Sequence, residues 1–187
     1  MIALEIYLAR HGETEWSASG RHTGSTDIPL TPRGEQRAAA LRPRLASIHF
    51  DAVFSSPMQR ARRTAELAGF ASPQITDFLR EVDYGDYEGR TSVEIHEANP
   101  SWEVYQDGSP GGETPAQIYA RAQAFLALAG QSGGLVLAFA HGHILRAVGA
   151  AWIRADITVA AGLMLDVATL SVVRDDGHRM ITLWNSA

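Results

Sequence analysis

The fold is decided by one stretch near the N-terminus, Leu4-Glu5-Ile6-Tyr7-Leu8-Ala9-Arg10-His11-Gly12-Glu13-Thr14. Its first six residues are a short apolar run rich in β-formers, which predicts a strand buried on both faces, as in a parallel sheet. In open α/β sheets, chemistry gathers beyond the carboxyl ends of the strands. An imidazole at that position, beside a permanently charged guanidinium, is well suited to a phosphoryl group.

A second apolar run ends in the same way. Residues 135–140, Leu-Val-Leu-Ala-Phe-Ala, are followed by His141-Gly142. Parallel strands have their carboxyl ends at the same edge of a sheet, so two strands that each deliver a histidine predict one shared site. Packing alone gives no reason for this repetition.

Six motifs, taken in order, resemble the histidine phosphatase superfamily, the phosphoglycerate-mutase-like enzymes, and together they span nearly the whole chain. They are Arg10-His11-Gly12-Glu13-Thr14, Thr23-Gly24 within residues 21–27, Leu30-Thr31 with Gly34, Ser55-Ser56-Pro57 with Arg60, Leu79-Arg80-Glu81 with residues 85–89, and His141-Gly142. A lone Arg-His-Gly recurs by chance, whereas six motifs in the family's order do not. The resemblance implies a three-layer α/β/α sandwich with a mostly parallel central sheet.

Composition narrows the class of protein. A length of 187 residues predicts a single domain over 1–187. The net charge of −5 argues against nucleic-acid binding, and the lack of cysteine excludes disulfides, thiolate metal sites and cysteine nucleophiles. No apolar run approaches the roughly 20 residues that span a bilayer. Without a basic segment leading into an apolar core, the chain is expected to be cytoplasmic.

Helix and strand signals alternate, as in a parallel α/β sheet. We expect helices over residues 31–45, 56–68, 92–97, 114–130 and 144–153, and strands over 4–9, 52–55, 78–79, 135–140, 170–174 and 180–184. Thr31-Pro32 and Thr114-Pro115 each combine an N-cap with a proline at the first helical position. Asp175-Asp176-Gly177 is a turn signal, which predicts an antiparallel hairpin at the end of the chain.

The resemblance assigns the catalytic histidines. A neutral imidazole nitrogen can attack phosphorus and form a covalent phosphohistidine, which divides one displacement into two. By this assignment His11 is the nucleophile. His141 is a further donor to the phosphoryl oxygens during transfer.

Arginines should bind the phosphate, because the planar guanidinium fork contacts it bidentately and stays charged. We assign Arg10 and Arg60 to this clamp. Arg60 lies in the first turn after a predicted strand, where a helix N-terminus also favours an anion. Arg62 and Arg63 are interpreted as surface charges.

Proton transfer needs a carboxylate that serves as acid for the leaving group and then as base for water. Among the nearby candidates, Glu13, Glu81, Asp83, Asp86 and Glu88, the resemblance favours Glu81.

Further substrate contacts are expected from five residues, Ser17, Thr23, Gly24, Gly142 and His143. By resemblance, Thr23 and Gly24 supply a hydroxyl and a backbone amide. Ser17 stands where many relatives have a phosphate-binding asparagine. His143 either lines the site or packs at the start of a helix, and both interpretations stay open here.

The sequence therefore predicts a metal-independent phosphomonoesterase without a cofactor, acting on a small phosphorylated metabolite such as a sugar phosphate or bisphosphate. A homodimer is left open. The first alternative is a cofactor-dependent phosphoglycerate mutase. Such mutases carry an insertion after the Glu81 region and a long C-terminal tail, whereas here about 60 residues separate Glu81 from His141.

Two alternatives come from other classes. A metal-dependent phosphohydrolase needs ligand spacing that the chain lacks, since His141 and His143 are its only close histidine pair. A catalytically inactive binding module would have lost one of the five catalytic candidates, and all five are present.

Overall fold

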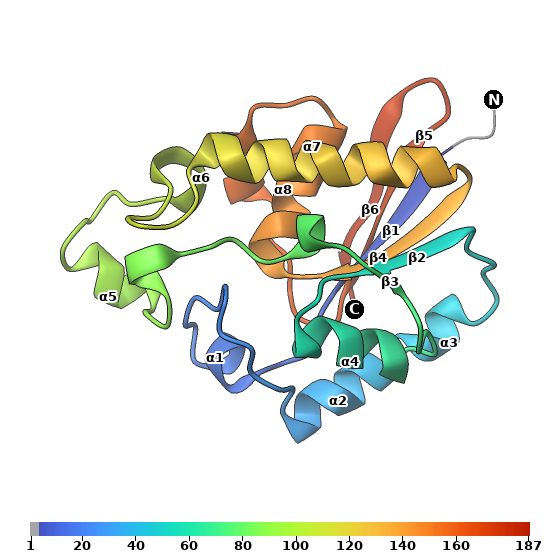
Figure 1. The fold of residues 1–187 in the computed structure, drawn as a ribbon, viewed down its shortest axis with the longest axis horizontal. Coiled ribbons are helices and arrows are strands. Elements are labelled where there is room, and N and C mark those ends of the chain that lie inside the picture. Colours follow the sequence, from blue (N-terminus) through green and yellow to red (C-terminus); the bar gives the residue numbers. More distant parts are fainter. Residues whose placement is uncertain (1–3) are drawn as a thin grey trace.

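The computed structural model describes residues 4–187, whose centre is a six-stranded sheet in the order β3-β2-β4-β1-β5-β6 (Figure 1). The strands are β1 (Leu4–Arg10), β2 (Ala52–Ser55), β3 (Gln74–Ile75), β4 (Leu135–Ala140), β5 (Leu170–Asp175) and β6 (Arg179–Ser186). The first four strands pair in parallel, β5 pairs antiparallel with β1, and β6 pairs antiparallel with β5. This mixed, mostly parallel sheet confirms the expected fold class.

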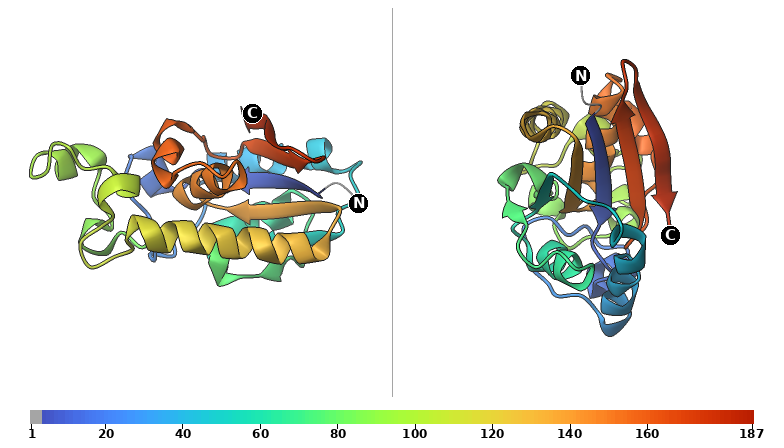
Figure 2. Two further views of the ribbon diagram at one scale, coloured as in Figure 1. Left: turned by 90° about the horizontal axis from the view of Figure 1, so that it is seen from above. Right: turned by 90° about the vertical axis from the view of Figure 1, so that its right-hand side faces the viewer.

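Helices cover both faces of the sheet (Figures 1 and 2). They are α1 (Glu15–Ala18), α2 (Pro32–Ala39), α3 (Arg42–Leu45), α4 (Gln59–Leu67), α5 (Ser92–His96), α6 (Val104–Asp107), α7 (Pro115–Ser132) and α8 (Gly142–Trp152), with 3₁₀ turns η1 (Asp77–Leu79), η2 (Gly85–Tyr87) and η3 (Ile157–Gly162). None of the helices in residues 4–187 combines the length and apolar character that a membrane crossing requires.

The strands are apolar throughout because each face of the sheet has its own core. Val136 and Ala138 of β4 pack with α7 and α8 on one face, and Leu137 and Phe139 pack with α3 and α4 on the other. Successive side chains of a strand point to opposite faces, so both sets need apolar side chains.

Two of the expected elements differ in the structure. The helix expected over 31–45 is divided into α2 and α3, because Pro43 has no N–H and its ring would clash with the carbonyl of Ala39 in a continuous helix. The strand expected at 78–79 is the 3₁₀ turn η1, and the edge strand β3 lies slightly earlier, paired with Phe54 and Ser55. The hairpin predicted around residues 175–177 is confirmed by β5 and β6.

The helix after β2 begins later than expected. Its N-cap is Met58, so Ser56 lies outside the helix and its hydroxyl accepts from the Met58 N–H at 3.3 Å. This places a buried hydroxyl group directly at the end of β2.

The strand order brings the two histidine motifs together. β4 lies between β2 and β1, and Arg10 is paired with Ala140 at the end of the ladder. The pairing continues one residue further, since the His11 N–H donates to the Ala140 carbonyl at 2.9 Å. His11 and His141 therefore leave adjacent strands at the same edge of the sheet.

Candidate active site

The two histidines face one another beyond the strand ends. Their ring centroids are 5.1 Å apart, and the side chains are nearly inaccessible to solvent, at 4% for His11 and 0% for His141. A cleft of about 150 Å³, which we call the histidine cleft, opens beside His11. His141 and Arg60 are fully buried and do not line it. Its lining residues are Arg10, His11, Ser17, Gly20, Arg21, His22, Thr23, Glu81, Tyr84 and His143.

Hydrogen bonding fixes the tautomer of His11. Its Nδ1 lies 2.7 Å from the carbonyl oxygen of Gly12, which can only accept, so Nδ1 carries the proton. In the neutral ring Nε2 then has a free lone pair. Burial, followed by the charges of Arg10 and Arg60, holds the pKa of His11 well below its usual value, so the ring is neutral near pH 7.

His141 has the opposite tautomer. Its Nδ1 accepts from the Nε–H of Arg60 at 3.0 Å, because a guanidinium can only donate. The proton of the neutral ring is therefore on Nε2, which donates to the Ser56 hydroxyl at 2.8 Å. Burial and the adjacent Arg60 keep the pKa of His141 well below its usual value.

Two arginines, Arg10 and Arg60, lie close to the histidines and form no ion pair within the described part of the chain. Arg60 is fully buried and donates to the carbonyl oxygens of Thr23, Gly24 and Thr26 at 2.9–3.0 Å. Arg10 donates to the Leu165 carbonyl, while its buried Nε–H has no partner among residues 4–187. Glu81 attracts both arginines without a direct ion pair. Two guanidinium groups and an unsatisfied donor together favour an anion at this position.

Glu81 is held at the N-terminus of α8. Its Oε1 accepts from the backbone N–H groups of Val82 and Ile144, and its Oε2 accepts from that of His143, all at 2.9–3.0 Å. Each carboxylate oxygen has two acceptor positions. Oε2 is therefore the oxygen that retains a free position, and it belongs to a residue that lines the cleft.

The other predicted contacts divide into two groups. Ser17, Thr23 and His143 line the histidine cleft. Gly24 does not, and its N–H donates to the Glu88 carboxylate at 2.9 Å. Gly142 lies behind Arg10, where a Cβ would come within 3.3 Å of the guanidinium carbon.

A family model described as the histidine phosphatase superfamily (branch 1) matches residues 6–187. The chain belongs to this superfamily. As a histidine phosphatase it is an enzyme, and the family implies a phosphorylated small molecule as its substrate.

Known relatives of this histidine phosphatase include several phosphatases. The chain is 39% identical to an acid phosphatase of Mycobacterium tuberculosis, over 89% of this chain and 84% of that protein. It is 37% identical to the sedoheptulose 1,7-bisphosphatase of Saccharomyces cerevisiae, over 78% of this chain and 66% of that protein. A solved structure of a Mycobacterium tuberculosis open reading frame superposes with a TM-score of 0.94 at 36% identity, covering 98% of this chain and 97% of that one.

Sequence reasoning missed part of the histidine cleft, namely Gly20, Arg21, His22 and Tyr84. Tyr84 is buried, and its hydroxyl lies 2.6 Å from Nδ1 of His143. Burial lowers the pKa of His22 to about 4, against a smaller opposing effect of Glu88. The sequence held a signal for two of these four residues. His22 directly precedes the Thr23-Gly24 motif, and Tyr84 follows Glu81 by three residues.

Glu13 does not line the cleft, although it belongs to the first motif. Its carboxylate accepts from the Thr31 hydroxyl at 2.9 Å, and its carbonyl accepts from the Thr31 N–H. It therefore ties the loop after His11 to the start of α2.

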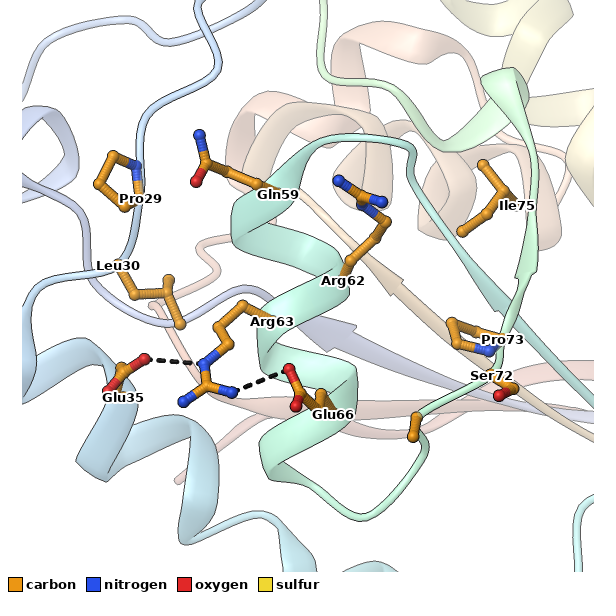
Figure 3. Close-up of a pocket in the computed structure, with 11 residues that line it drawn as sticks. Pro29, Leu30, Glu35, Gln59, Arg62, Arg63, Glu66, Ser72, Pro73 and Ile75 are labelled. Carbon is orange, nitrogen blue, oxygen red and sulfur yellow. Dashed lines mark hydrogen bonds and ion pairs between the residues drawn. The ribbon is translucent and has the colours of Figure 1, made fainter.

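A cleft larger than the histidine cleft lies elsewhere, and neither His11 nor His141 lines it. It measures about 590 Å³ and lies between α4 and the segment before β3 (Figure 3). Arg63 lies in it between the carboxylates of Glu35 and Glu66, each 2.8 Å away, and Arg62 lines it without an ion pair among the described residues. Both residues line this cleft, which we call the remote cleft because it shares no lining residue with the histidine cleft. Within residues 4–187, no three His, Asp or Glu side chains are grouped so that they could hold a metal ion.

Proposed function

We propose that this histidine phosphatase hydrolyses a small phosphorylated metabolite, of the sugar phosphate or bisphosphate class, through a phosphohistidine on His11 and without a metal ion. One observation carries the proposal. Nδ1–H of His11 donates to the Gly12 carbonyl, so the Nε2 lone pair of His11 is free beside Arg10 and Arg60, neither of which forms an ion pair within residues 4–187. A nucleophile for phosphorus and the positive charge that binds its oxygens are thus in one place.

In the first step, Nε2 of His11 attacks phosphorus as the bond to the leaving oxygen breaks. Arg10 and Arg60 stabilise the charge on the equatorial oxygens. To act as the further donor, His141 has to turn its Nε2–H from the Ser56 hydroxyl to a phosphoryl oxygen. The departing alkoxide takes a proton from Oε2 of Glu81, the oxygen with a free acceptor position. The products are the alcohol and phosphohistidine.

In the second step, Glu81 is a carboxylate and accepts a proton from water, whose oxygen attacks phosphorus. The bond from phosphorus to Nε2 breaks, inorganic phosphate leaves, and Glu81 has regained its proton. Three backbone N–H groups hold this carboxylate in place for both steps.

The proposed substrate class is supported by the size of the cleft and by the named relatives. A cleft of about 150 Å³ suits a small molecule. The yeast relative carries the name of a sugar bisphosphatase. Ser17, Thr23 and His143 line the cleft and are the proposed contacts to the substrate. Gly24 and Gly142 do not line it, and the Gly24 N–H is bonded to Glu88.

The test is to trap the phosphoenzyme. Wild-type protein mixed with a labelled phosphomonoester is expected to hold label that is stable to base and labile to acid, and His11→Ala is expected to lose both label and turnover. His178→Ala is the matched control, because that histidine is exposed in the turn between β5 and β6. Label on another residue of the wild type would contradict the proposal.

The same assays separate the alternatives. Phosphate release is expected to survive chelators and to need no bisphosphoglycerate primer. Loss of activity on chelation would indicate a metal-dependent phosphohydrolase. Primer-dependent interconversion of phosphoglycerates faster than phosphate release would indicate a mutase.

A further inference from the structure

The main chain around Glu81 has no regular secondary structure to hold it. Residues 81–84 lie between η1 and η2, outside every helix and strand. The carboxylate itself is held by amides of α8. Its geometry therefore also depends on whatever fixes the backbone on the other side.

An ion pair from α7 fixes that backbone. Nε and Nη2 of Arg121 donate to the two oxygens of Glu113, at 2.8 and 2.7 Å. Nη1 donates to the carbonyls of Phe78 and Arg80, and Nη2 also donates to the carbonyl of Glu81 at 3.3 Å.

Glu113 completes the contact from the other end of the pair. Its Oε2 accepts from the Asp83 N–H at 2.9 Å, and its own N–H donates to the Asp83 carbonyl at 2.9 Å. The Arg121–Glu113 pair thus forms hydrogen bonds with the main chain before Glu81, at Glu81 and after it.

The guanidinium has five N–H donors, and every one has a partner here. A lysine has three donors on one nitrogen and cannot reproduce this planar fork. The side chains are also shielded, with 16% of Arg121 and 18% of Glu113 exposed, so solvent weakens the pair less than it does an open surface pair.

We propose that Arg121 and Glu113 are positioning residues for proton transfer, which hold the main chain of Glu81 so that its carboxyl group reaches the leaving oxygen. This inference rests on the proposed function, in which Glu81 is the proton donor. Neither residue lines the histidine cleft, so both act through Glu81.

The experiment uses the dependence on the leaving group. In a reaction with a covalent intermediate, kcat/KM reports the first step, in which β-glycerophosphate needs a proton at its leaving alkoxide and p-nitrophenyl phosphate largely does not. Arg121→Lys is expected to lower kcat/KM for β-glycerophosphate about tenfold or more, with a loss below about threefold for p-nitrophenyl phosphate. Glu81→Gln is expected to show the same selectivity, and adding Arg121→Lys to it is expected to change kcat/KM less than about twofold, because both act on one interaction.

Arg63→Lys is the matched control, since Arg63 also pairs with carboxylates but lies in the remote cleft. Arg63→Lys is expected to leave kcat/KM unchanged for both substrates. Glu113→Gln keeps its size but loses its charge, and it serves as the test if Arg121→Lys does not fold, as judged by its thermal transition.

Two results would overturn the inference, and they differ from each other. Equal losses for both substrates in the Arg121 and Glu113 variants, with Glu81→Gln still selective, would show that the pair only stabilises the fold. Equal losses in Glu81→Gln itself would remove the acid role from Glu81, and with it both the proposed function of this residue and the inference.

Discussion

At the residue scale, the tautomers of the two histidines are set by groups that never change protonation state. A backbone carbonyl orients His11 and a guanidinium orients His141. Because burial and the nearby arginines lower both pKa values, the neutral form of each ring is favoured near pH 6.5, where an exposed histidine would be partly charged. The proposed nucleophile therefore needs no separate base to be ready for attack.

Arg10→Lys tests the phosphate clamp. Lysine keeps the charge but has one ammonium group in place of the planar guanidinium. It cannot both donate to the Leu165 carbonyl and present the second donor, Nε–H, which has no partner among residues 4–187. We expect kcat/KM to fall at least tenfold, which is more than about 1.4 kcal/mol of transition-state stabilisation. Steady-state kinetics measure this, with Arg62→Lys in the remote cleft as the control. Equal rates for Arg10→Lys and wild type would remove Arg10 from the clamp.

The residue types in the site could be predicted because phosphoryl transfer requires them and the motifs supply them in order. The hydrogen-bond partners of Arg60 could not be predicted from the sequence. They depend on the backbone conformation of residues 23–26, which brings carbonyl oxygens to the guanidinium. The role of Ser56 could not be predicted either, because nothing in the sequence shows that α4 starts late and leaves the Ser56 hydroxyl to accept from His141.

At the element scale, the start of α2 lies against the loop that follows His11. A Cβ on Gly12 would lie 2.4 Å from the carbonyl oxygen of Gly34, and a Cβ on Gly34 would lie 2.1 Å from that of Glu13. These are backbone atoms, which cannot move aside as a flexible side chain can. The two glycines thus allow α2 and the loop after His11 to pack in contact. A shift of this loop would move His11.

Gly34→Ala is therefore expected to reverse the usual effect of this substitution in a helix. Replacing a helical glycine by alanine commonly stabilises a protein by about 0.5–1 kcal/mol. Here the methyl group must push the loop away, so we expect destabilisation and a fall in kcat/KM. Chemical denaturation and kinetics measure the two effects.

Gly130→Ala provides the comparison within the same chain. Gly130 lies in α7, and a Cβ there would meet only a Leu4 side-chain carbon at 4.0 Å. It is expected to be neutral or stabilising, with unchanged kinetics. A stabilising Gly34→Ala would show that the loop relaxes without cost.

The elements themselves were predictable where local chemistry acts alone. Thr31-Pro32 and Thr114-Pro115 start α2 and α7 as expected, with each threonine side chain accepting from the N–H three residues later. The edge strand β3 was misplaced because it has only two residues, and its pairing with β2 rather than its own sequence defines it.

At the scale of the whole molecule, a chain with a net charge of −5 carries an anion site by keeping its cations local. Arg10 and Arg60 form no ion pair within the described residues 4–187, and burial lowers the pKa of each. His11, His22, His141 and His143 all have lowered pKa values, and burial is the largest cause for each.

This arrangement predicts acid lability. A histidine with a lowered folded-state pKa binds its proton first in the unfolded chain, so stability is fully present above about pH 6.5 and declines as the pH falls. For His22 the decline continues to about pH 4. Replacing it in His22→Gln is expected to reduce the slope of unfolding free energy against pH by up to about 1.4 kcal/mol per pH unit. Denaturation between about pH 7.5 and 4.5 measures it, with the exposed His178→Gln as control. An unchanged slope for His22→Gln would show that His22 titrates alike in both states.

The order of the strands has a consequence for how the chain is made. Both neighbours of β1 in the sheet, β4 and β5, come from residues 135–140 and 170–175. A ribosome adds about 5–20 residues per second, so the strand leading to His11 waits on the order of ten seconds for its partners. A nascent or truncated chain that stops before β4 lacks His141 and is expected to release no phosphate, so activity in a translation reaction reports chains that have been completed at least through β4 and His141.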